Sequence, residues 1–62
     1  MGRTWRVTFE FLNDCGRWMP DYLDGNGCGF LFREADMLKV DLEGRENIRN
    51  VRIEPMSEIR HW

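Results

Sequence analysis

Large apolar residues alternate with polar ones near the start of the chain. From residue 5 to residue 11 every second side chain is apolar, and these positions are Trp5, Val7, Phe9 and Phe11. A period of two is typical of a β-strand that buries one face, and aromatic and β-branched residues suit such a strand. Residues 13–16 end the strand, because Asn, Asp and Gly favour turns.

A weaker strand pattern follows over residues 17–23. Trp18 and Tyr22 share one face of an extended segment here, but Pro20 lies between them and has no N–H to donate to a neighbouring strand. We therefore expect an edge strand or irregular structure. Residues 24–29 hold three glycines and predict a flexible loop.

Two structures fit residues 30–43. An apolar stripe recurs there at helical spacing, and its members are Leu31, Ala35, Leu38 and Leu42. Strand alternation also fits residues 38–43. A helix leaves Val40 off the stripe, whereas a strand leaves residues 33–36 unexplained. We favour the helix, with Gly44 as the residue that follows its C-terminus, although no Ser, Thr or Asp caps its start.

A last strand is predicted over residues 50–54. Val51 and Ile53 are expected to point toward the core, and Pro55 ends the strand. The alternate residues Asn50, Arg52 and Glu54 then point outward, where their charges favour cross-strand pairs with the first strand. The two expected ion pairs are Arg52 with Glu10 and Glu54 with Arg6.

Together these elements predict a small α+β fold: an antiparallel sheet of about three strands with one helix on one face. The other face is expected to meet water. The chain has 62 residues, which is enough for one domain, so we take residues 1–62 as a single domain. Aromatic residues make up 13% of it. So small a core cannot hold them all, which favours an exposed apolar patch and a homo-oligomer or another partner.

The charge and the cysteine content indicate which class of partner and which cellular compartment to expect. The net charge is −2, and there is no basic stripe of the kind that binds a phosphate backbone, so a nucleic acid is the second choice of partner. Cys15 and Cys28 are expected as free thiols in a reducing cytoplasm, with one disulfide as the open alternative. Neither a signal segment nor a membrane-spanning stretch is recognisable, so we expect a cytoplasmic protein with no membrane partner.

No set of residues matches a catalytic or metal-binding motif. The loop that starts at Asp24 fits a calcium loop poorly, because Cys28 and Ala35 stand where oxygen ligands are needed. His61 is the single histidine and has no nucleophile in a recognisable arrangement. We expect no metal and no cofactor, and an enzyme is the less favoured class. Within that class, Asp14 is the first candidate for a Mg²⁺ ligand in DNA cleavage.

Aromatic residues and arginines are the best candidates for binding. The candidate binding residues are Trp18, Tyr22, Phe30, Arg33 and Trp62. Trp, Tyr and Arg dominate the hot spots of protein interfaces, and aromatic rings also stack on the bases of single-stranded nucleic acids. Each aromatic residue has the alternative role of filling the core. Between the two binding functions, the negative net charge favours a protein partner.

Three segments resemble small orphan proteins encoded in prophages and mobile elements of gut bacteria: residues 5–11 (WRVTFEF), 33–35 (REA) and 50–55 (NVRIEP). The resemblance covers about half of the chain and assigns no functional residue. Some proteins of this size and origin are anti-CRISPR inhibitors that bind a Cas nuclease. At least one such group has instead been linked to a single-strand-binding fold that acts on DNA.

Two functions therefore stay open at the level of the sequence. The leading hypothesis is a non-enzymatic protein-interaction module, of which a phage-derived, anti-CRISPR-like inhibitor is the sharpest form. The alternative is a single-strand DNA-binding or metal-dependent DNA-nicking protein. The salt dependence of binding distinguishes the two functions, because nucleic-acid binding weakens steeply as the salt concentration rises.

Overall fold

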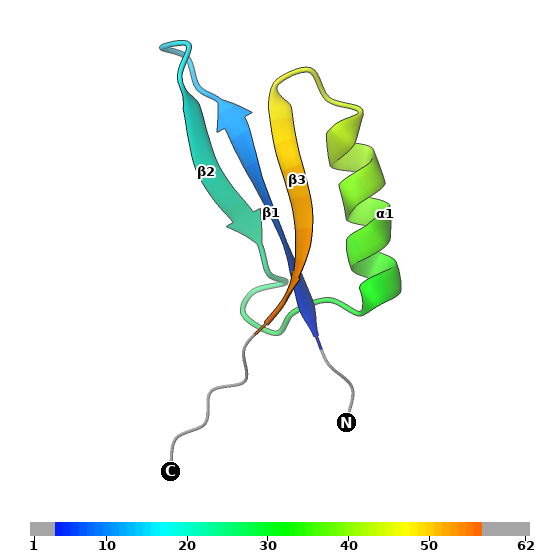
Figure 1. The fold of residues 1–62 in the computed structure, drawn as a ribbon. Coiled ribbons are helices and arrows are strands. Elements are labelled where there is room, and N and C mark those ends of the chain that lie inside the picture. The colour runs from blue at the N-terminus through cyan, green and yellow to red at the C-terminus, as the bar shows by residue number, and fades with distance from the viewer. Residues whose placement is uncertain (1–3, 57–62) are drawn as a thin grey trace.

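A computed structural model describes residues 4–56 (Figure 1). In chain order its elements are β1 (Trp5–Leu12), β2 (Trp18–Leu23), α1 (Phe32–Glu43) and β3 (Ile48–Pro55). The strands form one sheet in the order β2-β1-β3, and both pairs are antiparallel. This is the α+β fold that the sequence predicts, and residues 32–43 are helix rather than strand.

The alternation in β1, the central strand, separates the two faces of the sheet. Val7 faces α1 and is fully buried, at 0% exposure, with Phe9 packed against the same core. Paired residues on neighbouring strands share a face, so Leu23 and Ile53, which lie opposite Val7, also face the side of α1. We call the other side the open face. It carries Arg6, Thr8, Glu10 and Leu12 of β1, Trp18, Pro20 and Tyr22 of β2, and Arg49, Arg52 and Glu54 of β3.

β2 is an edge strand, in agreement with the presence of Pro20. The N–H of Asn13 donates to the Arg17 carbonyl oxygen at 2.8 Å, and hydrogen-bonded pairs then fall at every second residue. Pro20 takes a position between them, where its missing N–H would point away from β1. The next outward N–H, that of Tyr22, donates to Asp21 Oδ1 at 2.7 Å. This edge is therefore a poor template for another strand.

α1 packs its predicted apolar stripe against the sheet. Ala35 and Leu42 are buried, and Leu38 is partly buried against the same core. Leu31 is the exception, because it is the N-cap and is 64% exposed. Val40 is exposed to the same extent, 64%, in agreement with the helix pattern.

The two ends of α1 differ in detail from what the sequence predicts. The Leu31 N–H donates to Glu34 Oε1 at 3.0 Å, which is one half of a capping box. Gly44 was expected to follow the C-terminus of the helix, but it is the C-cap itself and keeps a helical backbone with φ −79°. Its N–H donates to the Asp41 carbonyl oxygen at 3.2 Å.

A β-bulge divides β3, which is longer than the strand predicted over residues 50–54. The register shifts between Thr8 and Glu10 of β1, where Asn50 adopts a φ of 55°. Asn tolerates this left-handed conformation better than most residues. Because the bulge inserts one extra residue, Ile48 and Val51 both face α1 although they are three positions apart in the sequence.

The same bulge corrects one predicted ion pair. Arg52 lies opposite Thr8, while Arg49 lies opposite Glu10. Arg49 Nε donates to Glu10 Oε1 at 2.8 Å. The predicted pair of Arg52 with Glu10 is therefore wrong, because it assumed a regular ladder without the extra residue.

The loop between β2 and α1 is tied to the start of β1. The Gly29 N–H donates to the Asp24 carbonyl oxygen at 2.6 Å. Gly29 has a φ of 81°, and a Cβ atom there would lie 2.5 Å from Thr4 Cβ, so only glycine fits. Phe30 and Trp5 then exchange two backbone hydrogen bonds, at 2.8 and 2.9 Å. This pairing places Phe30 beside the core.

α1 covers only part of the sheet. The buried side chains of the core are Val7, Ala35, Leu42 and Val51. The helix packs against β1 and β3 but not against β2, and Figure 1 shows it beside β3, with β2 on the far side of the sheet. β2 is thus left uncovered on both of its faces.

Candidate functional site

Two aromatic side chains project from β2 onto the open face. Trp18 lies opposite Leu12 and Tyr22 lies opposite Thr8. They are four residues apart, so strand alternation puts both on the same side, as the sequence predicts. Pro20 lies between them on that side. Tyr22 is 52% exposed and is available to a partner.

Trp18 lies against an arginine from β3. The guanidinium carbon of Arg49 is 4.2 Å from the centre of the Trp18 ring, which is a cation–π geometry. Arg49 Nε donates to Glu10 Oε1 at 2.8 Å, and Asn50 Nδ2 donates to the same oxygen at 3.0 Å. This cluster spans all three strands, and the bulge at Asn50 brings Arg49 into register with Glu10.

The Glu10 carboxylate is stabilised in its charged form. The side-chain hydrogen bond from Arg49, followed by that from Asn50, holds the pKa of Glu10 below its ordinary value of 4.5 and outweighs desolvation. Glu10 therefore stays ionised at neutral pH and fixes the position of Arg49 beside Trp18.

A second arginine lies beside the other aromatic ring. The guanidinium carbon of Arg6 is 5.9 Å from the centre of the Tyr22 ring. Arg6 Nη2 is 3.5 Å from Glu54 Oε1, which confirms the predicted Arg6–Glu54 pair. Both side chains of this pair are more than a third exposed, so it adds little stability. Arg6 Nε is buried and has no hydrogen-bond partner among the described residues.

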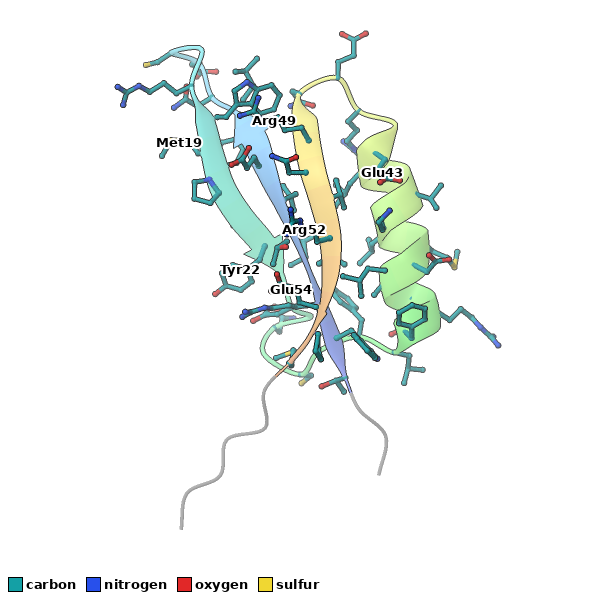
Figure 2. The ribbon with its side chains drawn as sticks, in the orientation of Figure 1. Met19, Tyr22, Glu43, Arg49, Arg52 and Glu54 are labelled. Carbon is teal, nitrogen blue, oxygen red and sulfur yellow. The ribbon has the colours of Figure 1, made fainter. Side chains whose placement is uncertain are left out.

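Arg52 lies between these two arginine–aromatic pairs. It is exposed and stands opposite Thr8 near the middle of β1. None of the ion pairs found within residues 4–56 includes Arg52. In Figure 2, Tyr22 lies on β2, and Arg52 and Glu54 lie on β3, the strand beside α1. Arginine is one of the residues most enriched in the hot spots of protein interfaces.

The structure brings together two of the five predicted binding residues. Trp18 and Tyr22 share the open face, as described above. Phe30 is partly buried and packs against the core, which is its alternative, structural role. Arg33 lies on α1, in the other layer of the fold. Trp62 lies outside the described residues.

Arg49 belongs to this surface but was not among the binding residues predicted from the sequence. Its contact with Trp18 depends on the strand order and on the bulge, and position 49 precedes the predicted strand. A signal was nevertheless present in the apolar pattern: Ile48, Val51 and Ile53 are spaced by three and then by two residues. Such a break in alternation indicates a bulge between the first two.

Neither a metal-binding group nor a disulfide is present among the described residues. Within residues 4–56, no three His, Cys, Asp or Glu side chains lie close enough to hold a metal ion. Asp14 is exposed in the turn between β1 and β2. Cys15 and Cys28 are free, exposed, and located beyond opposite ends of the six-residue β2. Such a strand spans about 20 Å, whereas a disulfide needs Cα atoms within about 7 Å, so the two do not pair in this fold.

Comparisons with protein-family models, with curated proteins and with solved structures find no match to this chain. In the part of the chain that the structure describes, no helix is both long and apolar enough to cross a bilayer. The open face is therefore assigned as the candidate site on its geometry and chemistry alone.

Proposed function

We propose that this chain is a non-enzymatic protein-binding module whose partner contacts the open face of the sheet. The supporting observation is that Trp18 and Tyr22 project from one edge strand and that each has an arginine beside it. Trp, Tyr and Arg are the side chains most enriched in binding hot spots. A sheet holds such groups in place before the partner arrives, which reduces the entropy lost on binding.

The charges of the open face favour a protein partner over a nucleic acid. Arg49 is paired with Glu10 and Arg6 with Glu54, which leaves Arg52 as the excess positive charge. The whole chain carries a net charge of −2. Binding to a phosphate backbone gains from many uncompensated cations. A nearly balanced surface with aromatic anchors instead suits another protein.

The sharpest form of this function is a phage-derived inhibitor of the anti-CRISPR type. This form rests on the resemblance of residues 5–11, 33–35 and 50–55 to small prophage proteins, and not on the geometry. An inhibitor of this kind occupies a surface of its target and needs no catalytic group. We also propose that the chain acts in the cytoplasm and that it self-associates into a homo-oligomer, independently of the partner of the open face.

Crosslinking from the open face tests the proposed function. A photoreactive phenylalanine analogue replaces Tyr22 in one variant and Glu46, which is exposed in the turn after α1, in a matched control. In cells that carry the gene, we expect the Tyr22 position to crosslink to one protein that the Glu46 position does not reach. Equal products from both positions would contradict the assignment of the open face.

The purified partner then allows a quantitative test. Tyr22→Ala and Arg49→Ala are each expected to raise the Kd of the complex about 10-fold or more, as hot-spot truncations do. Glu46→Ala is expected to leave the Kd within about twofold. A partner that binds the Tyr22 and Arg49 variants as tightly as the wild type does not use the open face.

Exposed aromatic rings on an open sheet also support a second candidate, binding to single-stranded DNA. Fluorescence anisotropy with an oligonucleotide of about 20 nucleotides, at about 50 and about 200 mM salt, separates the two. We expect no binding under either condition. Binding that weakens steeply with salt and is lost in Trp18→Ala would replace the proposed function. Nicking of supercoiled plasmid with Mg²⁺, absent in Asp14→Ala, would establish the nicking alternative.

A further inference from the structure

The helix side of β2 is an apolar surface that α1 leaves bare. An α-helix is about 10 Å across and covers about two strands, which lie about 4.8 Å apart. α1 packs on β1 and β3, so the third strand has no cover. Met19 and Leu23 lie on this side of β2 and are each 39% exposed, with Asp21 between them. We call these three residues the shelf.

α1 carries a second set of apolar residues on the side away from its own core. Met37 is 67% exposed and Val40 is 64% exposed. They are three positions apart, and Arg33 precedes Met37 by four, so all three lie along one side of the helix. This side differs from the buried stripe of Ala35, Leu38 and Leu42. We call Arg33, Met37 and Val40 the outer stripe.

The shelf and the outer stripe match in length and in charge. α1 has 12 residues and is about 18 Å long, while the six residues of β2 span about 20 Å. Asp21 gives the shelf a negative charge, and Arg33 gives the outer stripe a positive one. Both residues are exposed, and neither takes part in an ion pair found within residues 4–56.

We propose that a second copy of this chain covers the shelf: the outer stripe of each protomer lies on the shelf of the other, with Arg33 of one copy near Asp21 of its partner. In each protomer α1 packs on β1 and β3 and leaves the helix side of β2 uncovered, so the protomer has a step beside the helix. Two such shapes interlock about a twofold axis, and every contact then occurs twice. The two helices form the middle layer, and both open faces remain outside.

A second copy is favoured over a foreign protein because one chain holds both complementary surfaces. The core of the described residues contains four buried side chains, while Met19, Leu23, Met37 and Val40 remain exposed. Chains of this size commonly gain stability by self-association. The proposed dimer buries these exposed groups without using the open face, so it stands or fails independently of the proposed function.

Sedimentation velocity of the wild type from about 1 to about 200 µM tests whether the chain associates. We expect a species of twice the 7.5 kDa chain mass at the upper concentrations. The charge reversals Asp21→Arg and Arg33→Asp each create two like-charge contacts in a symmetric dimer. Each is expected to raise the dimer Kd at least about 30-fold. Asp14→Arg, an exposed reversal outside both surfaces, serves as the matched control and is expected to dimerise as the wild type does.

An equimolar mixture of the two reversal variants gives the decisive result. In a mixed dimer both contacts again join opposite charges, so we expect dimerisation to recover to within about threefold of the wild-type Kd. Recovery also proves that both variants fold. A wild type that stays monomeric at all concentrations, reversals that dimerise normally, or a mixture that remains monomeric would each overturn the proposal.

Discussion

Both faces of β2 are exposed, but they hold their side chains in different ways. On the open face, Tyr22 lies beside Arg6 of the neighbouring strand β1, and Trp18 lies beside Arg49 of β3. On the helix side, Met19 and Leu23 are apolar and have no helix above them. On the open face, ion pairs and cation–π contacts hold side chains that can remain in contact with water. On the helix side, the apolar side chains gain free energy when they are permanently buried, as in the interfaces of obligate dimers.

The difference between the faces has two structural causes. The bulge at Asn50 brings Arg49 to the open face and thereby links β3 to Trp18 across β1. The width of a single helix limits how much of the other face α1 can cover. In the two proposals, β2 thus carries a surface for a different protein on one side and a surface for self-association on the other.

The largest expected effect comes from removing the packing that holds the sheet to α1. Val7 is fully buried, whereas the next residue, Thr8, lies on the open face. We expect Val7→Ala to lower the free energy of unfolding by about 2 kcal/mol. Thr8→Ala, the matched control, is expected to change it by less than about 0.5 kcal/mol. Urea denaturation measures both, and equal losses would show that the two faces do not differ in burial.

The next effect tests the bulge that organises the open face. Asn50 has a φ of 55°, which a β-branched residue adopts only under strain. Asn50→Val is expected to cost about 1–2 kcal/mol of unfolding free energy relative to Asn50→Gly, which accepts this φ freely. Both variants lose the amide contact with Glu10, so their difference isolates the backbone. Equal stability in urea would contradict the bulge.

A smaller effect tests the arginine–aromatic contact itself. A double-mutant cycle with Trp18→Ala, Arg49→Ala and the double variant is expected to give a coupling energy of about 0.5–1 kcal/mol in urea denaturation. The same cycle with Trp18 and Arg33, which lies on α1, serves as the control and should give no coupling within error. Zero coupling for the first pair would mean that Arg49 does not hold the ring.

The smallest effect is a pH dependence of stability that comes from Glu10. Its pKa is lower in the folded chain than its ordinary 4.5, so the unfolded chain binds the proton more tightly. The stabilisation is therefore complete above about pH 4.5 and decreases as the pH falls through the lower pKa of the folded state. Urea denaturation between about pH 7 and pH 3 should show a shallower acid loss in Glu10→Gln than in the wild type. Identical pH profiles would show that Arg49 and Asn50 do not stabilise the carboxylate.

Patterns within short stretches of the sequence predicted two elements of the fold and the position of two aromatic residues. β1 follows from strict alternation, and α1 follows from the spacing of Ala35, Leu38 and Leu42. The same alternation placed Trp18 and Tyr22 on one face. Each of these features depends on residues close together in the sequence, where periodicity is informative.

The remaining features depend on contacts between distant segments. Arg49 reaches Trp18 only because β1 separates β2 from β3 and because a bulge shifts the register. Phe30 was a candidate binding residue, but its backbone pairing with Trp5 places it beside the core. The apolar spacing of β3 indicates the bulge, but the strand order and the pairing of Trp5 with Phe30 leave no pattern in the sequence.

The central claim is that the two faces of β2 have different partners, and NMR of the isolated protein tests it most directly. A concentration series from about 20 to about 500 µM follows the methyl signals of Met19, Leu23 and Met37 and the ring signals of Trp18 and Tyr22. We predict that the methyl signals shift with concentration while the ring signals remain constant. Shifts centred on Trp18 and Tyr22, with the methyl signals unchanged, would contradict the account.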